Sequence, residues 1–189
     1  MNILTDKIEN IIKTKISEEI YTDFRRGILF ELLMQNNKIS EKEKILQTLQ
    51  LFYKDISKIK NVEKAIENII WFYKCGKEEN INQENKKNNK KQIYGYEFDD
   101  ELIYDAFKGQ YGIDLQDIEY LHWWKFKAMF EGLKEDNQIV KIMGYRAMDI
   151  SKIKDKDERK RYKEIQKLYA LPDMRTKEQK EADFAKAFW

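Results

Sequence analysis

The scarcity of helix-breaking residues is the feature that most limits what this chain can fold into. The 189 residues include one proline and seven glycines. Proline and glycine mark turns and chain breaks, so a fold of many short strands joined by tight turns would need more of them. The chain also carries 10 Phe, 11 Tyr and 4 Trp, which supply the apolar surface for a core. We therefore expect a mainly α-helical, multi-helix, bundle-like fold.

A polar stretch divides the chain into two halves. Lys77 to Lys91 is rich in lysine and asparagine and has Ile81 as its only apolar residue. Such a segment buries too little surface to offset the entropy of ordering it. We expect an N-terminal helical region over residues 1–76, a flexible polar linker over 77–93, a C-terminal helical region over 94–172 and an amphipathic tail over 173–189.

The segment from Ile8 to Tyr21 fits two structures. Its isoleucines recur at spacings of three and four residues, which favours a helix. The β-branched run around Thr14 is equally typical of a short N-terminal β-hairpin. Both alternatives stay open at this point.

Capping residues place three helices in the first half. Asp23 precedes a helix over 24–34, Ser40 and Glu43 form a capping box, and Asn61 opens a third helix that ends before Gly76. The apolar spacing predicts one buried stripe for each helix. These stripes are Ile28, Leu29, Leu32 and Leu33; then Ile45, Leu49, Phe52 and Ile56; then Val62, Ile66, Ile69 and Tyr73.

Further helices are predicted in the second half. Acidic residues at 99–101 open a helix that ends near Gly109 or Gly112. Asp114 is expected to cap a helix over 115–130, with Gly132 as its stop. The remaining predictions are a helix over 139–148, a charged helix opened by Asp155 and Glu158, and a last helix from Thr176 to Phe188.

The predicted helix over 115–130 is unusually aromatic and apolar nearly all round. Trp123, Trp124 and Phe126 lie on different sides of it. A helix of this kind either packs inside its own core or offers a second face to a partner. Tryptophan is enriched at binding hot spots, which supports the second alternative. The sequence leaves both alternatives open, with the core alternative favoured.

Residues that could carry chemistry are few. The single histidine, His122, and the single cysteine, Cys75, do not provide a zinc site or a Cys–His pair. We expect no catalytic residues, metal or cofactor, and hence no enzyme. An acidic cluster is explained more simply by helix capping than by a cation site; its members are Glu97, Asp99, Asp100, Glu101 and Asp105. Gly144, inside a predicted helix, either permits close packing or marks a helix end.

The charge pattern argues against a nucleic-acid partner. Lys and Arg number 36 and Asp and Glu 34, giving a net charge of +2. The basic residues 159–161 have acids close to them on both sides, which predicts a solvated helix face with ion pairs; these acids are Asp155, Asp157, Glu158 and Glu164. The other basic cluster, Lys86 to Lys91, lies in the predicted linker. With no apolar run of about 18 residues and no signal-peptide pattern, we expect no membrane contact and a cytoplasmic location.

Several motifs resemble a family of small bacteriophage and prophage proteins. They are Thr22-Asp23-Phe24-Arg25, Trp71 to Gly76, Tyr111 to Leu115, Tyr120 to Ala128, Lys141 to Arg146 and Leu168 to Pro172. The resemblance spans roughly Thr22 to Pro172. Members of this family often begin with a hairpin whose turn contains Asp-Gly. Here the corresponding Thr14-Lys15-Ile16-Ser17 has no glycine, which weakens the hairpin alternative.

The resemblance implies a role in phage tail assembly. Genes of this family lie in the tail module, between the major tail protein and the tape-measure protein. Its members are therefore candidate tail assembly chaperones, which bind the tape-measure protein, recruit tail-tube subunits and leave the finished tail. Self-association is an open alternative, and a structural tail or connector component is the second candidate. The candidate partner-binding residues are Trp123, Trp124, Phe126, Tyr145, Arg146, Phe184, Phe188 and Trp189.

Overall fold

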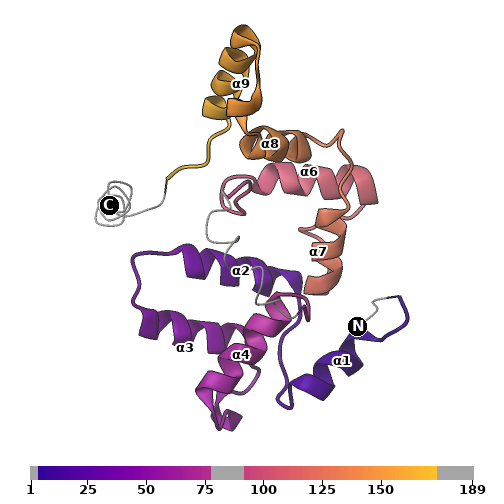
Figure 1. Ribbon diagram of the computed structural model, residues 1–189. Helices are drawn as coiled ribbons and strands as arrows, with labels where there is room; N and C mark the ends of the chain where they lie inside the picture. The colour runs from indigo at the N-terminus through magenta and orange to yellow at the C-terminus, as the bar shows by residue number, and fades with distance from the viewer. Residues whose placement is uncertain (1–3, 78–91, 174–189) are drawn as a thin grey trace. The chain divides into compact units, whose positions relative to one another are not determined.

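The computed structural model describes residues 4–77 and 92–173, and these are mainly α-helical, as predicted (Figure 1). The only β pairings among them are two isolated bridges, Ile20 with Tyr53 and Asp23 with His122. No helix in these two ranges combines the length and the apolar composition needed to cross a membrane. The helices are α1 (Ile8–Lys15), α2 (Phe24–Gln35), α3 (Glu41–Phe52), α4 (Val62–Tyr73), α6 (Asp100–Tyr111), α7 (Trp123–Glu131), α8 (Gln138–Ala147) and α9 (Lys156–Leu168), with 3₁₀ turns η1 (Ile56–Lys58) and η3 (Ile150–Lys152).

The described residues form two compact units. Unit 1 comprises residues 4–77 and Tyr120–Lys127, and unit 2 comprises 92–119 and 128–173. Of the predicted C-terminal region over 94–172, the aromatic segment Tyr120–Lys127 belongs to unit 1 and the other residues belong to unit 2. The predicted linker at 78–91 and the tail from residue 174 lie outside the described residues.

The N-terminal segment of unit 1 is helical. Residues Ile8–Lys15 form α1, with Ile8 and Ile12 buried one turn apart. The helix alternative is thus confirmed and the hairpin is wrong. Ile16 and Ile20 are also buried, but they lie beyond the helix in extended backbone.

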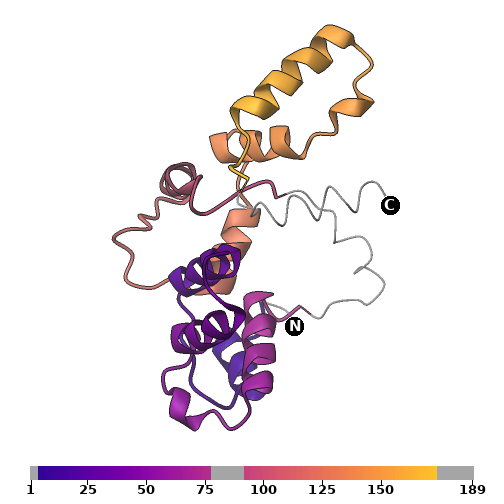
Figure 2. The same cartoon turned by 90° about the vertical axis from the view of Figure 1, so that its left-hand side faces the viewer.

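The predicted caps of unit 1 are confirmed. The Asp23 carboxylate accepts the amide of Arg25, and Ser40 and Glu43 form the reciprocal capping box. Asn61 Oδ1 accepts the amide of Lys64 at 2.9 Å. The three capped helices pack in chain order, α2 against α3 and α3 against α4, as both views show (Figures 1 and 2).

The predicted buried stripes of these helices are only partly right. Leu49, Phe52 and Ile69 are buried, but Leu29, Ile45, Ile56 and Val62 are exposed. The faces that pack inward are rotated from the predicted stripes. They consist of Phe24, Gly27 and Phe30 in α2; Lys44, Thr48, Leu49 and Phe52 in α3; and Ala65, Asn68, Ile69 and Phe72 in α4.

In unit 2, α6 ends where the glycines predict. Gly112 adopts φ 66°, a left-handed conformation that glycine reaches without steric cost, and its amide bonds to Lys108 O at 3.0 Å. The next prediction is wrong, because Asp114 does not open a helix at 115. Its Oδ1 accepts the amides of Gln116 and Asp117, but the chain makes a turn there and α7 begins at Trp123. The stop before Gly132 is confirmed.

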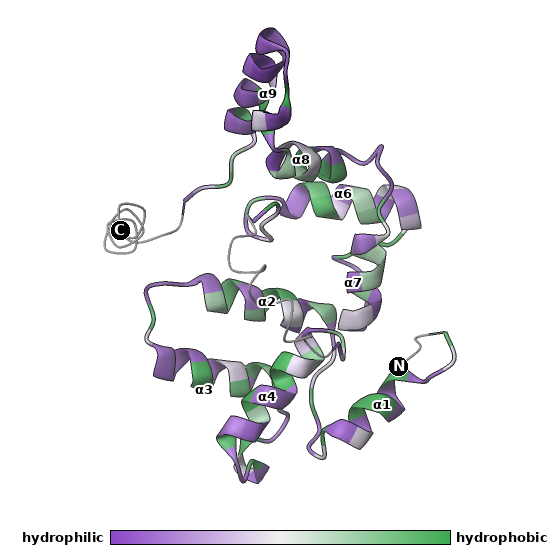
Figure 3. Cartoon of the chain, in the orientation of Figure 1, coloured by the Kyte–Doolittle hydropathy of each residue, from purple (hydrophilic) through white to green (hydrophobic). Residues whose placement is uncertain are grey.

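The last two helices follow the predicted boundaries closely. α8 continues past Gly144, and a Cβ built there would meet nothing within 4 Å, so neither predicted role of this glycine is right. Asp155 caps α9 by accepting the amide of Glu158 at 2.7 Å. α9 is largely hydrophilic (Figure 3), folds back beside α8 and η3 (Figure 2), and has no buried residue. Within residues 92–173 its basic residues 159–161 form none of the predicted ion pairs.

Candidate interaction surface

One face of α4 in unit 1 is apolar and open to solvent. Asn61 caps the helix, and the residues that follow are apolar at two sets of positions one turn apart. Ala65, Ile69 and Phe72 belong to the set that packs inward. The other set, Val62, Ile66 and Ile70, forms a row along the outside, where Val62 and Ile70 are exposed and Ile66 is half-buried.

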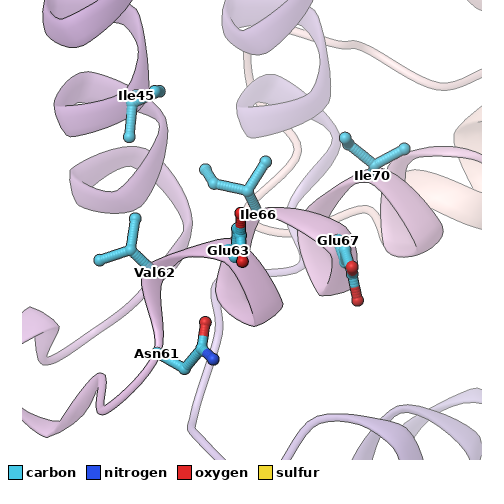
Figure 4. A pocket seen from close by; sticks show the side chains of 7 residues that line it. All are labelled: Ile45, Asn61, Val62, Glu63, Ile66, Glu67 and Ile70. Carbon is cyan, nitrogen blue, oxygen red and sulfur yellow. The ribbon is translucent and has the colours of Figure 1, made fainter.

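This row lines a shallow hollow of about 520 Å³ between α4 and α3. Ile45 of α3 projects toward Val62, and Val62, Ile66 and Ile70 point to the same side of α4 (Figure 4). The remaining lining residues are Asn61, Glu63 and Glu67. We call this feature, lined by Ile45, Asn61, Val62, Glu63, Ile66, Glu67 and Ile70, the α4 groove.

The charged residues of the α4 groove are acidic. Glu67 accepts a hydrogen bond from Lys64 Nζ at 2.9 Å, and this contact lowers the pKa of the Glu67 carboxyl. Glu63 lies in the first turn of α4, where the helix dipole favours a carboxylate, and forms no ion pair within the described ranges. The lining of the α4 groove contains no nucleophile and no acid–base pair. Its row of branched apolar side chains with an acidic edge has the shape and chemistry to receive the apolar face of another helix.

The predicted anchor residues Trp123, Trp124 and Phe126 lie in the interior of unit 1. All three are buried, with Trp124 at 2% exposure and the other two at 0%. The indole N–H of Trp123 donates to Tyr73 O at 2.8 Å, and that of Trp124 donates to Phe72 O at 2.7 Å. Both acceptors are carbonyls at the C-terminal end of α4, where Phe72 O also accepts the amide of Cys75 at 3.0 Å. The burial matches the core alternative, and partner binding by these rings stays a prediction.

His122 is also buried, with 1% exposure. Its Nδ1 accepts the amide of Trp124 at 3.0 Å, while Nε2 has no hydrogen-bond partner among the described residues. The rings of Phe72 and Trp124 pack against it, each about 6 Å away between ring centroids. Desolvation by burial lowers the pKa of His122 to about 4, so the imidazole is neutral at pH 7. It is a core residue in an aromatic setting.

Tyr145 and Arg146 take structural positions in unit 2. Arg146 and Asp99 form a bidentate ion pair, with N–O distances of 2.6 and 2.9 Å, and both side chains are buried. Arg146 also donates to the carbonyls of Ile93 and Tyr169. The ring of Tyr145 stacks on that of Tyr169 at 6.2 Å. Arg146 therefore links α8 to Asp99, just before α6, and to Tyr169, just after α9.

The acidic cluster is not arranged around a cation. No group of three or more His, Cys, Asp or Glu residues in the described ranges could hold a metal ion. Asp99 precedes α6, yet its side chain makes no capping bond, because Arg146 and the amide of Gly95 occupy it; side-chain capping by Asp99 was thus a wrong prediction. Asp100 and Glu101 do lie in the first turn of α6. The other predicted anchors, Phe184, Phe188 and Trp189, lie outside the described residues.

Sequence reasoning missed the α4 groove. The apolar spacing predicted Val62 and Ile66 in the buried stripe of their helix, but Val62 is exposed and Ile66 is half-buried. A signal was present, because α4 is apolar at two sets of helical positions and only one set can pack inward. Like the aromatic segment, α4 is apolar on more than one face, and its sequence pattern alone indicates a second apolar face.

The described residues thus define a mainly α-helical protein with an open apolar groove. The chain belongs to the bacteriophage Gp15 protein family, whose sequence model matches residues 4–171. No curated protein and no solved structure matches it.

Proposed function

We propose that this protein is a non-catalytic phage tail assembly chaperone. It acts in the bacterial cytoplasm during tail assembly, binds helices of the tape-measure protein and recruits major tail protein subunits around them. Membership of a bacteriophage family supports the phage setting. The gene position of the proteins that the sequence resembles supports the tail-assembly role.

The α4 groove is the observation that carries the binding role. The resemblance implies a long, helical tape-measure protein that the chaperone keeps soluble, and we infer that its helices offer apolar faces to this chain. An amphipathic helix binds through side chains at positions i and i+4, and the row Val62, Ile66, Ile70 has that spacing. Isolated exposed apolar residues are ordinary on protein surfaces. Val62, Ile66 and Ile70 instead line one hollow together, which supports a helix-binding role.

The experiment is co-expression with the tape-measure protein of the same tail module. We expect this chain to raise the soluble fraction of the tape-measure protein and to co-purify with it. If it does neither, the chaperone proposal fails. This outcome does not depend on which surface of the chain makes the contact.

A pair of matched variants tests the α4 groove itself. Ile70 and Met34 have the same exposure, 38%, and each lies in the last turn of its helix, but only Ile70 lines the groove. Ile70→Asp places a charge in the groove, and we expect it to weaken the complex at least about tenfold. Met34→Asp should leave the affinity unchanged. Equal affinities for the two variants, both folded by circular dichroism, would remove the groove from the proposal.

A further inference from the structure

We propose that the α4 groove selects a partner helix that carries lysine or arginine beside its apolar row. The inference rests on the proposed role of this groove in helix binding, and it names the charge of the helix that the groove accepts. It follows from two rows of side chains on α4 that line the groove (Figure 4). One row is apolar, with Val62, Ile66 and Ile70, and the other is acidic, with Glu63 and Glu67.

The acidic row runs beside the apolar row along α4. Each carboxylate comes one position after a residue of the apolar row, so it is turned by about 100° around the helix from that residue. Glu63 and Glu67 are themselves one turn apart, as the apolar residues are. A helix that packs on the apolar row therefore places the side chains at the edge of its own contact face next to these two carboxylates.

The two carboxylates differ in what already binds them. Glu67 is paired with Lys64 Nζ at 2.9 Å, whereas Glu63 forms no ion pair within residues 4–77 and 92–173. A cation on the partner helix therefore gains most at Glu63. An exposed ion pair adds only modest affinity, but a like charge at the same place is rejected. We thus expect the acidic row to act mainly on which helix is bound, while the apolar row supplies the contact area.

The same charges disfavour a second copy of this chain as the occupant. In an antiparallel pair of α4 helices about a two-fold axis, the residue after each apolar residue lies on the same side of both helices. The acidic row of one copy would then face the acidic row of the other. A helix of opposite charge meets no such repulsion, so it fits the α4 groove better than α4 itself does.

Two synthetic peptides of about 20 residues, long enough to form helices, test the inference on the full-length protein. Both carry isoleucine at three positions one turn apart on an alanine-rich helix. One peptide has lysine on both flanks of this row and the other has glutamate, so the result does not depend on the direction in which the peptide lies. At low salt we expect the lysine peptide to bind about tenfold more tightly by fluorescence anisotropy, and about 0.5 M salt should reduce this ratio to about twofold.

Glu63→Lys and Glu101→Lys are a matched pair of variants. Both residues are exposed and lie in the first turn of a helix, but only Glu63 lines the α4 groove. The two substitutions therefore change the net charge equally and place lysine at equivalent ends of a helix dipole. We expect Glu63→Lys to abolish the preference for the lysine peptide and Glu101→Lys to retain it.

Equal affinities of the two peptides for the unmodified protein would overturn the inference and leave the α4 groove as a helix site. Binding of neither peptide would remove the groove as well, while co-expression with the tape-measure protein would still decide the chaperone role. A preference that persists in folded Glu63→Lys, or that is lost equally in Glu101→Lys, would also overturn the inference. If Glu63→Lys does not fold, the salt dependence decides, because a ratio unchanged by salt contradicts a role for charge.

Sedimentation of the protein without peptide tests the alternative occupant. We expect no dimer that competes with the lysine peptide. A dimer that the lysine peptide dissociates and that Ile70→Asp abolishes would assign the α4 groove to a second copy and would overturn the inference.

Discussion

At the scale of single residues, the space around a side chain decides what a substitution does. Gly27 lies in α2 directly against the buried ring of Trp123, and a Cβ there would overlap ring carbons, with Trp123 Cζ3 at 2.7 Å. We predict that Gly27→Ala lowers the free energy of unfolding of unit 1 by about 2 kcal/mol. The overlap of a tightly packed core costs roughly 1–3 kcal/mol and outweighs the better helix propensity of alanine.

Gly144→Ala is the matched control for Gly27→Ala. Gly144 also lies inside a helix, but a Cβ there meets nothing within 4 Å. Only helix propensity then changes, and we expect the free energy of unfolding to rise by up to about 1 kcal/mol. Urea unfolding followed by far-UV circular dichroism measures both variants. A stabilising Gly27→Ala would contradict the packing of Trp123 on α2.

The buried histidine makes the stability of unit 1 depend on pH. The pKa of His122 is about 4 in the folded chain, against 6.5 for an unperturbed imidazole, because burial disfavours the charged form. Between pH 4 and pH 6.5 the unfolded chain binds more protons than the folded one. The free energy of unfolding is therefore highest above about pH 6.5 and decreases as the pH falls toward 4. The loss is about 3 kcal/mol.

A proton NMR titration measures this pKa directly, because the chain contains one histidine and gives one imidazole signal. We expect a midpoint near 4 in the folded protein. His122→Gln keeps an acceptor for the amide of Trp124 but does not titrate, so its stability should fall less than that of the wild type between pH 7 and pH 4. A midpoint near 6.5 would show that His122 is accessible to water in solution.

At the scale of elements, the ends of helices were more predictable from sequence than their buried faces. Caps depend on residues a few positions apart, so Ser40 with Glu43 and Asp155 with Glu158 identified their helices correctly. Buried faces depend on distant partners. The ring of Trp123 lies against Gly27, which turns α2 inward along Phe24, Gly27 and Phe30, and a glycine gives no apolar signal.

The start of α7 shows the same limit. Asp114 accepts two downstream amides as a cap does, but the chain beyond it is held by a distant segment. Phe24 donates to Leu121 O, and Trp123 donates to Thr22 O, both at 2.8 Å. These bonds hold the backbone of residues 121 and 122 extended, so α7 begins only at Trp123. Partners about 100 residues away in the chain cannot be inferred from local spacing.

The buried ion pair of unit 2 gives a prediction for element packing. Asp99→Asn removes the charge that faces Arg146, which also binds the carbonyls of Ile93 and Tyr169. An uncompensated buried guanidinium is costly, so we expect the free energy of unfolding to fall by about 3–5 kcal/mol. Asp100→Asn, one residue on and exposed, loses only its favourable position in the first turn of α6 and should lower it by less than about 1 kcal/mol. Urea unfolding measures both, and equal effects would contradict the pairing.

At the scale of the whole molecule, the aromatic side chains that the sequence indicated as anchors lie inside unit 1, while an open apolar row lies on α4. The aromatic residues mark the family, and Trp123 and Trp124 stabilise unit 1 from within. The apolar row of the α4 groove is aliphatic and gave a weaker signal. Large aromatic side chains bury much apolar surface, so in this chain the aromatic segment marks the core of unit 1.

The composition of finished phage particles distinguishes the two candidate roles. A chaperone leaves the tail when the tube subunits have replaced it on the tape-measure protein, so we predict that purified particles lack this chain. Quantitative mass spectrometry of particles measures it against the tape-measure protein, while infected-cell lysate is the positive control for detection. One or more copies per tape-measure protein in the particles would instead identify the chain as a tail or connector component. In that case the α4 groove would be a permanent contact, and Ile70→Asp would reduce the yield of intact tails and not only the solubility of the tape-measure protein.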